Sequence, residues 1–214
     1  MTRRLLDYGE SAVLVECADL DDALGLKVRL DQRPLPAVAE VVPGARTLLL
    51  RLTAPLSAAD REQLVTLPAA AGSEREAAPV RIEVAYDGAD LAEVAELTGL
   101  SANEVVAAHT GQVWSVGFCG FAPGFGYLRG EHDRLRVPRR SSPRTRVPRG
   151  AVGLADEWSG VYPREGPGGW QLIGRTEEVL WDLDQSPPAL LQPGMRVQFV
   201  PAGRDPTGAG DAAG

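Results

Sequence analysis

The segment Gly117-Phe-Cys-Gly-Phe-Ala-Pro-Gly-Phe-Gly-Tyr127 places four glycines, one proline and four aromatic rings within one short stretch of the chain. Glycine and proline allow the backbone to reverse sharply, with positive φ angles where a turn needs them. A loop that carries so many aromatic rings is usually packed against the rest of its domain. The rings either form the wall of a pocket or fill the end of a β-barrel. In the first interpretation the candidate substrate-binding residues are Phe121, Pro123, Gly124, Phe125 and Tyr127.

The sequence around this segment indicates the barrel itself. Short apolar runs alternate with glycine and proline at residues 114–118, 172–173, 179–183 and 195–200. That rhythm is typical of a compact β-barrel with long loops. Upstream, a strand is expected at 80–86 and two helices at 90–98 and 102–109, with capping boxes at Asp90-x-x-Glu93 and Ser101-x-x-Glu104. We therefore predict one β-barrel domain over residues 79–202.

A smaller unit precedes the barrel. Its expected elements are a strand at 11–16, a helix at 21–32, two strands at 38–42 and 46–52, and a helix at 57–67. The order β-α-β-β-α predicts a ferredoxin-like α/β sandwich over residues 1–78. An alanine-rich linker is expected at 68–79 and a disordered tail, rich in glycine and alanine, at 203–214. The expected fold class is α+β, with the sandwich followed by the barrel.

Composition and charge argue against several classes of protein. The 214 residues carry a formal net charge of −7, which argues against binding to nucleic acid or to an acidic membrane surface. No apolar run is long enough to span a membrane, and the first residues lack the apolar core of a signal peptide. Cys17 and Cys119 lie far apart and outside any metal-binding spacing. We therefore expect no metal site and a reducing, cytoplasmic location.

A second cluster is rich in arginine. Residues 134–149 contain seven arginines and no acidic residue. The planar fork of donors on a guanidinium group suits carboxylates and phosphates. This arginine-rich segment is therefore a candidate for binding an acidic substrate, a phosphorylated intermediate or an acidic partner surface. The alternative is that these arginines pair with the protein's own carboxylates at the surface.

A third cluster covers residues 160–170. Here Pro167-Gly168-Gly169 can present successive backbone N–H groups to an anion. Tyr162 and Trp170 can flank a small planar ligand. A plain tight turn is the alternative interpretation.

His109 is a candidate general base, because the pKa of a histidine side chain lies near neutrality. It is also expected at a helix C-terminus, where the helix dipole alone favours a histidine. His132 lies in a polar stretch and is expected to be exposed. Cys119 lacks an evident base and is expected to be a small buried hydrophobic residue.

At these clusters the sequence resembles one family in both order and spacing. The matching motifs are Gly120-Phe-Ala-Pro-Gly-Phe-Gly-Tyr-Leu128, Pro138-Arg139, Ser142-Pro-Arg144, Ser159-Gly-Val-Tyr-Pro163 and Pro167-Gly-Gly-Trp-Gln-Leu-Ile-Gly174. The family is that of the B subunit of 5-oxoprolinase, also called KipI or allophanate hydrolase subunit 1, or carboxyltransferase subdomain C and D. The resemblance extends from about Leu5 to Pro201 and is strongest between Tyr86 and Thr176.

The resemblance implies a fold, an activity and partners. The implied fold is an N-terminal α/β domain followed by a cyclophilin-like β-barrel. The implied partners are 5-oxoprolinase subunits A and C, in a complex that hydrolyses 5-oxo-L-proline to L-glutamate with ATP, which is expected to bind with Mg²⁺ to the complex. This chain alone is expected to be inactive.

The resemblance also suggests a mechanism, in which phosphorylation of the amide oxygen precedes attack by water. Arg139 and Arg144 would hold the carboxylate or phosphoryl group. His109 would move a proton, and the loop 121–127 with Trp170 would shape the pocket.

One departure from the family pattern concerns the ligand. The family commonly has Ala-Gly-x-Gln-Thr-Gly before its Tyr-Pro, whereas this chain has Ala155-Asp-Glu-Trp-Ser-Gly160, so that Trp158 replaces a glutamine.

Two other functions fit the resemblance. One is a carboxyltransferase component of an allophanate hydrolase or urea carboxylase, with biotin on another chain. The other is a KipI-like inhibitor of a sensor histidine kinase. A prolyl isomerase activity would rest on analogy of fold alone.

Overall fold

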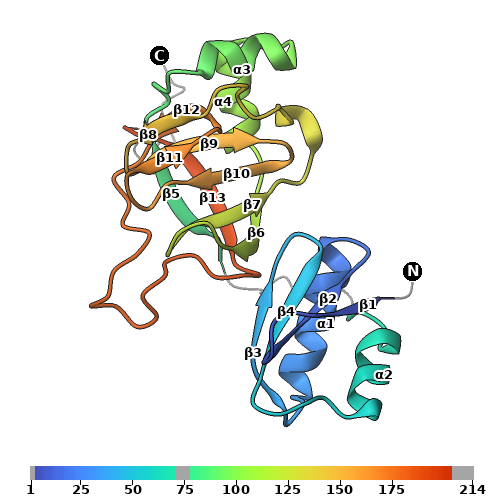
Figure 1. The fold of residues 1–214 in the computed structure, drawn as a ribbon. Helices are drawn as coiled ribbons and strands as arrows, with labels where there is room; N and C mark the ends of the chain where they lie inside the picture. The colour runs from blue at the N-terminus through green and yellow to red at the C-terminus, as the bar shows by residue number, and fades with distance from the viewer. Residues whose placement is uncertain (1–2, 71–77, 204–214) are drawn as a thin grey trace, which may run out of the picture.

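The computed structural model describes residues 3–70 and 78–203, which form two units (Figure 1). The smaller N-terminal unit lies beside one end of a larger β-barrel. Residues 71–77 of the predicted linker and residues 204–214 of the predicted tail lie outside the described residues. The division of the chain at residue 78 stays a prediction.

The N-terminal unit is one antiparallel sheet with two helices. Its elements are β1 (Arg4–Asp7), β2 (Ala12–Glu16), α1 (Leu20–Gln32), β3 (Val38–Pro43), β4 (Thr47–Leu52) and α2 (Ala58–Thr66). The strands lie in the order β1-β2-β4-β3. The five elements predicted from the sequence are all present, and β1 is an additional strand at the sheet edge, paired with β2 alone. The description of this unit as ferredoxin-like stays a prediction.

Helix α1 forms because a capping residue precedes its first turn and apolar residues recur along it at helical spacing. The side chain of Asp19 accepts a hydrogen bond from the backbone N–H of Asp22, which caps the first turn. Apolar residues at helical spacing then face the sheet and are buried: Ala23, Leu26 and Leu30. They pack with residues of β2, β4 and α2 into one core, which includes Val13, Val15, Leu48, Leu50 and Leu64.

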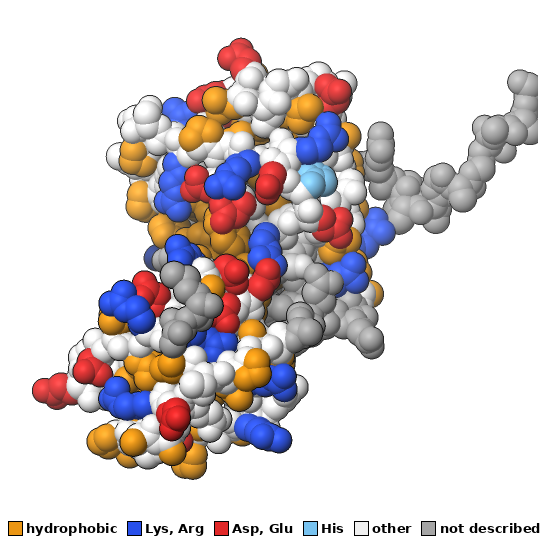
Figure 2. Space-filling model, turned by 90° about the vertical axis from the view of Figure 1, so that its right-hand side faces the viewer, with side chains coloured by type: hydrophobic (Ala, Val, Ile, Leu, Met, Phe, Trp, Pro, Cys, Tyr) orange, Lys and Arg blue, Asp and Glu red, His pale blue; other side chains and the backbone are white. Residues whose placement is uncertain are grey.

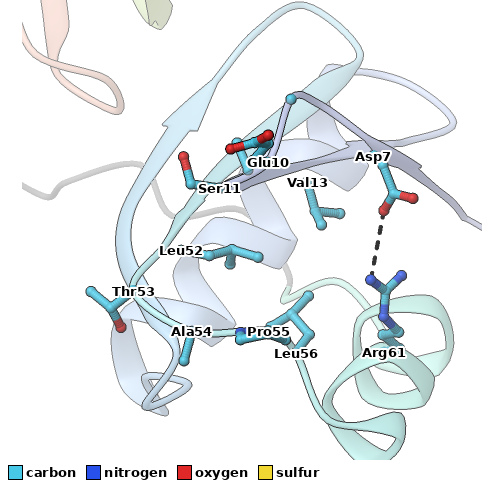
Figure 3. A pocket seen from close by; sticks show the side chains of 12 residues that line it. Asp7, Glu10, Ser11, Val13, Leu52, Thr53, Ala54, Pro55, Leu56 and Arg61 are labelled. Atoms are coloured by element: carbon cyan, nitrogen blue, oxygen red, sulfur yellow. Dashed lines mark ion pairs between the residues drawn. The ribbon is translucent and has the colours of Figure 1, made fainter.

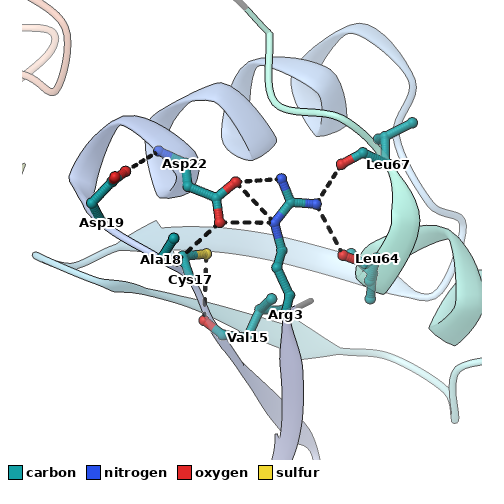
Figure 4. Close-up of polar contacts among 8 residues, drawn as sticks. All are labelled: Arg3, Val15, Cys17, Ala18, Asp19, Asp22, Leu64 and Leu67. Atoms are coloured by element: carbon teal, nitrogen blue, oxygen red, sulfur yellow. Dashed lines mark hydrogen bonds and ion pairs between the residues drawn. The ribbon is translucent and has the colours of Figure 1, made fainter. Parts of the chain in front are cut away.

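Arg3 ties the start of the chain to both helices of this unit (Figure 4). Its guanidinium group pairs with the Asp22 carboxylate at 2.6 Å and donates hydrogen bonds to the backbone carbonyls of Leu64 and Leu67. The side chain of Arg3 is buried, and the residue is 7% exposed. Burial disfavours the charged form of Asp22, but hydrogen bonds from Arg3 and from the Ala18 N–H hold the pKa of Asp22 below its ordinary value.

The second unit contains the barrel. Its elements are β5 (Val80–Val84), α3 (Leu91–Thr98), α4 (Ala102–Thr110), β6 (Trp114–Cys119), β7 (Gly126–Arg129), the 3₁₀ helix η1 (Asp133–Leu135), β8 (Arg144–Val147), β9 (Ala151–Ala155), β10 (Trp158–Val161), β11 (Gly166–Gly168), β12 (Gln171–Arg175) and β13 (Arg196–Pro201). Seven strands form one sheet in the order β12-β9-β10-β7-β6-β13-β5. A separate two-stranded sheet joins β8 to β11.

The seven-stranded sheet closes almost completely on itself. Beyond the end of β5, Ala85 forms an isolated antiparallel bridge with Arg175 of β12, so the first and last strands of the sheet meet. The predicted β-barrel is therefore confirmed, and the fold is mixed α and β. The cyclophilin-like description stays a prediction.

An apolar cluster, separate from the cores of the two units, joins them. Leu20 and Leu24 of α1 pack with aromatic residues of the barrel, among them Phe118 and Trp158. Gly117 lies at this contact, where an added Cβ would come within 3.0 Å of Leu20 and 3.1 Å of Trp158. Glycine at this position therefore permits the close approach of α1 to the barrel.

The surface carries charges of both signs. On the face shown in Figure 2, acidic and basic side chains are interspersed over both units, with hydrophobic side chains gathered between them. Among the described residues, no helix is long and apolar enough to cross a membrane.

We predict that Arg3 stabilises the N-terminal unit. In Arg3→Leu the carboxylate of Asp22 would lose its buried partner, and the free energy of unfolding should fall by about 3 kcal/mol. The matched control is Arg4→Leu, because Arg4 is exposed and its ion pair with Glu16 lies in solvent, so we expect a change below about 1 kcal/mol. Urea unfolding followed by circular dichroism measures both values, and equal losses in the two variants would contradict the assignment.

Candidate functional site

Aromatic rings pack around Phe125 in an apolar cluster that is separate from the core of the barrel. Its ring is buried, and its centroid lies 5.1 Å from that of Tyr127 and 5.3 Å from those of Tyr162 and Trp170. Most pairs have the edge-to-face geometry that aromatic rings favour. The rings therefore pack against one another outside the barrel core, and neither the pocket wall nor the filled barrel end predicted from the sequence describes them fully.

Phe121 and the turn around it form the exposed edge of the same cluster. The Phe121 side chain is 60% exposed, although its ring meets the edge of Tyr162 at 6.1 Å between centroids. Its φ angle of 66° is rare for a residue with a bulky side chain. Gly124 also has a positive φ, and an added Cβ would come within 2.9 Å of Trp181. The turn is thus held in a strained form that presents Phe121 to solvent, as residues at ligand or partner sites often are.

The third sequence cluster joins these rings through a short sheet. Strand β8 pairs with β11 so that Arg144 lies opposite Gly168. Gly168 in turn lies against Tyr162, because an added Cβ would come within 2.3 Å of the Tyr162 hydroxyl. The backbone N–H of Trp170 donates a hydrogen bond to that hydroxyl. The structure therefore brings Arg144, Tyr162, Gly168 and Trp170 together, whereas Gly169 contacts Pro143 nearby.

The positive charges of Arg139 and Arg144 affect the pKa values of two tyrosine hydroxyls, those of Tyr162 and Tyr127. Burial raises the pKa of the Tyr162 hydroxyl, and the Trp170 N–H with the charges of Arg139 and Arg144 opposes that shift. Burial also raises the pKa of Tyr127, again opposed by Arg139. Both hydroxyls therefore stay protonated at neutral pH and can donate hydrogen bonds. Donors of this kind beside guanidinium groups suit a ligand with a carboxylate or carbonyl oxygen.

Arg144 is held by a residue that the sequence analysis assigned to another role. Asp90 accepts hydrogen bonds from Arg144 Nη2 at 2.6 Å and from Arg140 Nη1 at 2.7 Å. It occupies the N-cap position of α3, but its side chain makes no capping hydrogen bond. The capping box predicted at Asp90 is therefore wrong, because the carboxylate turns to the arginines instead. The box at Ser101 and Glu104 is confirmed.

His109 lies inside the barrel core, away from the arginines. The side chain has no exposed surface; Nδ1 lies 2.7 Å from the Tyr86 hydroxyl and Nε2 lies 2.9 Å from Ser159 Oγ. Its ring also stacks on Phe199. Burial lowers the pKa of His109 from 6.5 to about 3, so the ring is neutral at physiological pH. This position argues against the proton-transfer role predicted for His109 and assigns its ring to the core.

The remaining predicted residues lie near the surface or in packing positions. Arg139 is exposed, with its Nε 3.9 Å from the carboxylate of Asp156, and Pro123 is exposed. Trp158, which replaces the family's glutamine, is buried against Phe118 and Tyr127. Its ring therefore fills space between barrel and α1, and it presents no polar group comparable to a glutamine amide.

The resemblance places ATP and Mg²⁺ in the complex and assigns neither to a residue of this chain. No group of three or more His, Cys, Asp or Glu that could hold a metal ion occurs in the described part of the chain. The glycine-rich segment 117–127 also lacks the Gly-Lys-Ser/Thr of a phosphate-binding loop. We therefore assign no step of nucleotide chemistry to the described residues.

The structure also has hollows away from these residues. One, of about 410 Å³, lies in the N-terminal unit between β1, β4 and α2 (Figure 3). Asp7 and Arg61 form an ion pair at its wall. Another, of about 530 Å³, lies along residues 179–195. Neither is lined by a residue that the sequence analysis assigned to the site.

Comparisons with known proteins agree over most of the chain. The family model described as "Carboxyltransferase domain, subdomain C and D" matches residues 3–191. The B subunit of 5-oxoprolinase from Escherichia coli O157:H7 is 41% identical over 204 residues, which are 90% of this chain and 93% of that protein. The crystal structure of TTHA0988 is similar with a TM-score of 0.73 and 35% identity, over 95% of this chain but 41% of that one. The K. lactis urea amidolyase is similar with a TM-score of 0.70 over 93% of this chain and 15% of that one; at 19% identity this shows the fold alone.

We predict that Gly168 cannot be replaced without moving Tyr162. A methyl group in Gly168→Ala would overlap the Tyr162 hydroxyl, and the free energy of unfolding should fall by about 2 kcal/mol. Gly169→Ala is the matched control, because its nearest neighbour would be Pro143 at an ordinary 3.5 Å. Thermal unfolding of both variants compares them, and an unchanged Gly168→Ala protein would contradict the close packing.

We also predict a pH dependence of stability from His109. The unfolded chain binds a proton at His109 below pH 6.5, whereas the folded chain does so only near pH 3. The free energy of unfolding should therefore fall as the pH falls through this window, with a slope approaching about 1.4 kcal/mol per pH unit. Urea unfolding at several pH values should show a flatter slope in His109→Gln and an unchanged slope in His132→Gln; equal slopes in all three proteins would refute the prediction.

Proposed function

Because the chain belongs to the family of carboxyltransferase domains, subdomains C and D, we propose that it is the B subunit of an ATP-dependent 5-oxoprolinase. The complex would hydrolyse 5-oxo-L-proline to L-glutamate. The observation that carries this proposal is the 41% identity to a protein named as that component of 5-oxoprolinase, because it extends over nearly the full length of both chains. The second support is the group of arginines and tyrosines at the edge of the aromatic cluster.

The chemistry of that group suits 5-oxoproline. The substrate has one carboxylate and one lactam carbonyl, both of which accept hydrogen bonds. Arg144 and Arg139 can hold the carboxylate, and the protonated hydroxyls of Tyr162 and Tyr127 can donate to a carbonyl oxygen. The ring of Phe121 can cover the apolar face of the substrate. In this proposal the chain binds and orients the substrate.

Partner chains supply the rest of the reaction. The relatives are named as one lettered subunit of 5-oxoprolinase, which implies an enzyme of several subunits. We propose subunits A and C as the partners, with ATP and Mg²⁺ bound outside this chain. Two exposed apolar side chains next to the site support such contacts, namely Phe121 and Trp181, which lies against Gly124. The chain would then be inactive alone. Both cysteines are free thiols, as expected for a cytoplasmic complex.

A second candidate function is a carboxyltransferase component of a urea carboxylase type. The family description and the fold shared with the K. lactis urea amidolyase favour it. The low identity to that enzyme makes it the weaker candidate. Its test is the transfer of a carboxyl group from carboxybiotin to urea by the assembled proteins.

The test of the proposed function is ATP-dependent release of glutamate from 5-oxoproline. Three mixtures are compared: this chain alone, the chain with subunits A and C, and subunits A and C without it. We expect glutamate from the complete mixture alone. Full activity without this chain would overturn the proposal.

Within the active mixture, Arg144→Met should raise KM for 5-oxoproline by about tenfold or more, because a hydrogen-bonded charged donor is lost. Arg146→Met is the matched control, since Arg146 lies two residues along the same strand and its side chain is exposed beside Glu165. We expect the control to keep KM within about twofold of the wild type. Equal effects of the two substitutions would contradict the placement of Arg144 in the site.

A further inference from the structure

Asp90 is among the most buried charged residues that the structure describes, with 3% of its surface exposed. Its Oδ1 atom accepts hydrogen bonds from both Arg140 and Arg144, and its Oδ2 atom accepts one from the backbone N–H of Leu172 at 2.7 Å. A buried carboxylate is retained at little cost only when its oxygens are satisfied in this way. One side chain thereby joins the start of α3, the arginine-rich segment and strand β12.

The two arginines differ in how much they depend on Asp90. Arg140 has a second acidic partner, Glu93, at 3.3 Å. For Arg144, Asp90 is the one acidic partner among the residues that the structure describes. The orientation of the Arg144 guanidinium group therefore depends on Asp90 more than that of Arg140 does.

Arg144 also keeps a donor that no protein atom uses. Its Nη1 is buried and has no hydrogen-bond partner, as is the case for the Oε1 of Gln171, a residue 1% exposed. An unsatisfied buried donor costs free energy, so its retention calls for an explanation. Because Nη1 is enclosed by protein, a ligand would meet the exposed part of the Arg144 side chain, which is 23% exposed. Arg144 lies opposite Gly168, which lies against the Tyr162 hydroxyl, so a ligand bound to Arg144 would lie near Tyr162.

We propose that Asp90 is a positioning residue, which fixes the guanidinium group of Arg144 through Nη2 so that the exposed part of that group can bind the substrate carboxylate. The proposal rests on the proposed function of Arg144 in substrate binding. Asp90 itself does not touch the substrate. Its replacement should therefore weaken binding by loss of orientation, without a change in the groups that react.

The kinetic test compares Asp90→Asn with Glu93→Gln in the complex with subunits A and C. Both substitutions convert an acid of the same ion-pair cluster into its amide, but only Asp90 contacts Arg144. We expect Asp90→Asn to raise KM for 5-oxoproline about tenfold with kcat within about threefold, and Glu93→Gln to leave both near the wild-type values. A fall in kcat at unchanged KM would indicate a merely structural role and overturn the proposal, as would equal effects of the two variants.

A second measurement does not depend on the enzyme activity. In the chain alone, NMR signals of the Arg144 guanidinium N–H groups, assigned with Arg144→Lys, should be separate and slowly exchanging in the wild type and in Glu93→Gln. They should average in Asp90→Asn and in Asp90→Glu, which keeps the charge but moves the carboxylate. Unchanged signals in both Asp90 variants would refute the positioning role. If the wild-type complex releases no glutamate, the proposed function fails, and the NMR result still decides the role of Asp90.

Discussion

The arrangement of the candidate site depends on one buried carboxylate. Asp90 holds Arg140, Arg144 and the backbone of Leu172 with three hydrogen bonds of 2.6–2.7 Å. Residues 138–143 belong to no strand or helix, so the ion pairs supply the order that a sheet would otherwise give. Strand β8 begins at Arg144, and its pairing with β11 carries that order to Gly168 and Tyr162. The position of Arg144 near Gly168 and Tyr162 therefore follows from a carboxylate that is itself outside the site.

Close packing is the second constraint, and glycine makes it possible. Gly117 admits α1 beside Trp158, and Gly168 admits the hydroxyl of Tyr162. The rings of the aromatic cluster pack against one another, and polar donors lie at its edge. Such an edge is completed when another chain covers it, which agrees with the proposal that the site works within a complex.

Local signals in the sequence predicted most elements of the fold. Helix α4 depends on its local cap at Ser101, and helix α1 depends on the apolar spacing of Leu26 and Leu30. Both helices are present as expected. Strand β1 was missed because its four residues show no alternation and pair with one neighbour alone. The closure of the barrel depends on residues far apart in sequence, such as Ala85 and Arg175, which periodicity does not connect.

The candidate site could be predicted only in part, because some of its contacts join residues that are far apart in the sequence. Its arginine, tyrosine and glycine clusters stand out by composition, and the structure brings Arg144, Tyr162, Gly168 and Trp170 together. The role of Asp90 was missed because its spacing to Glu93 indicated a local cap, whereas its partners lie about fifty residues away. The enclosure of His109 depends on tertiary packing, which its pKa in isolation does not reveal. The central claim is tested most directly by a crystal structure of the assembled complex with 5-oxoproline. The account predicts the substrate carboxylate within hydrogen-bond distance of the Arg144 guanidinium group and near Tyr162, and a substrate bound away from both residues would contradict it.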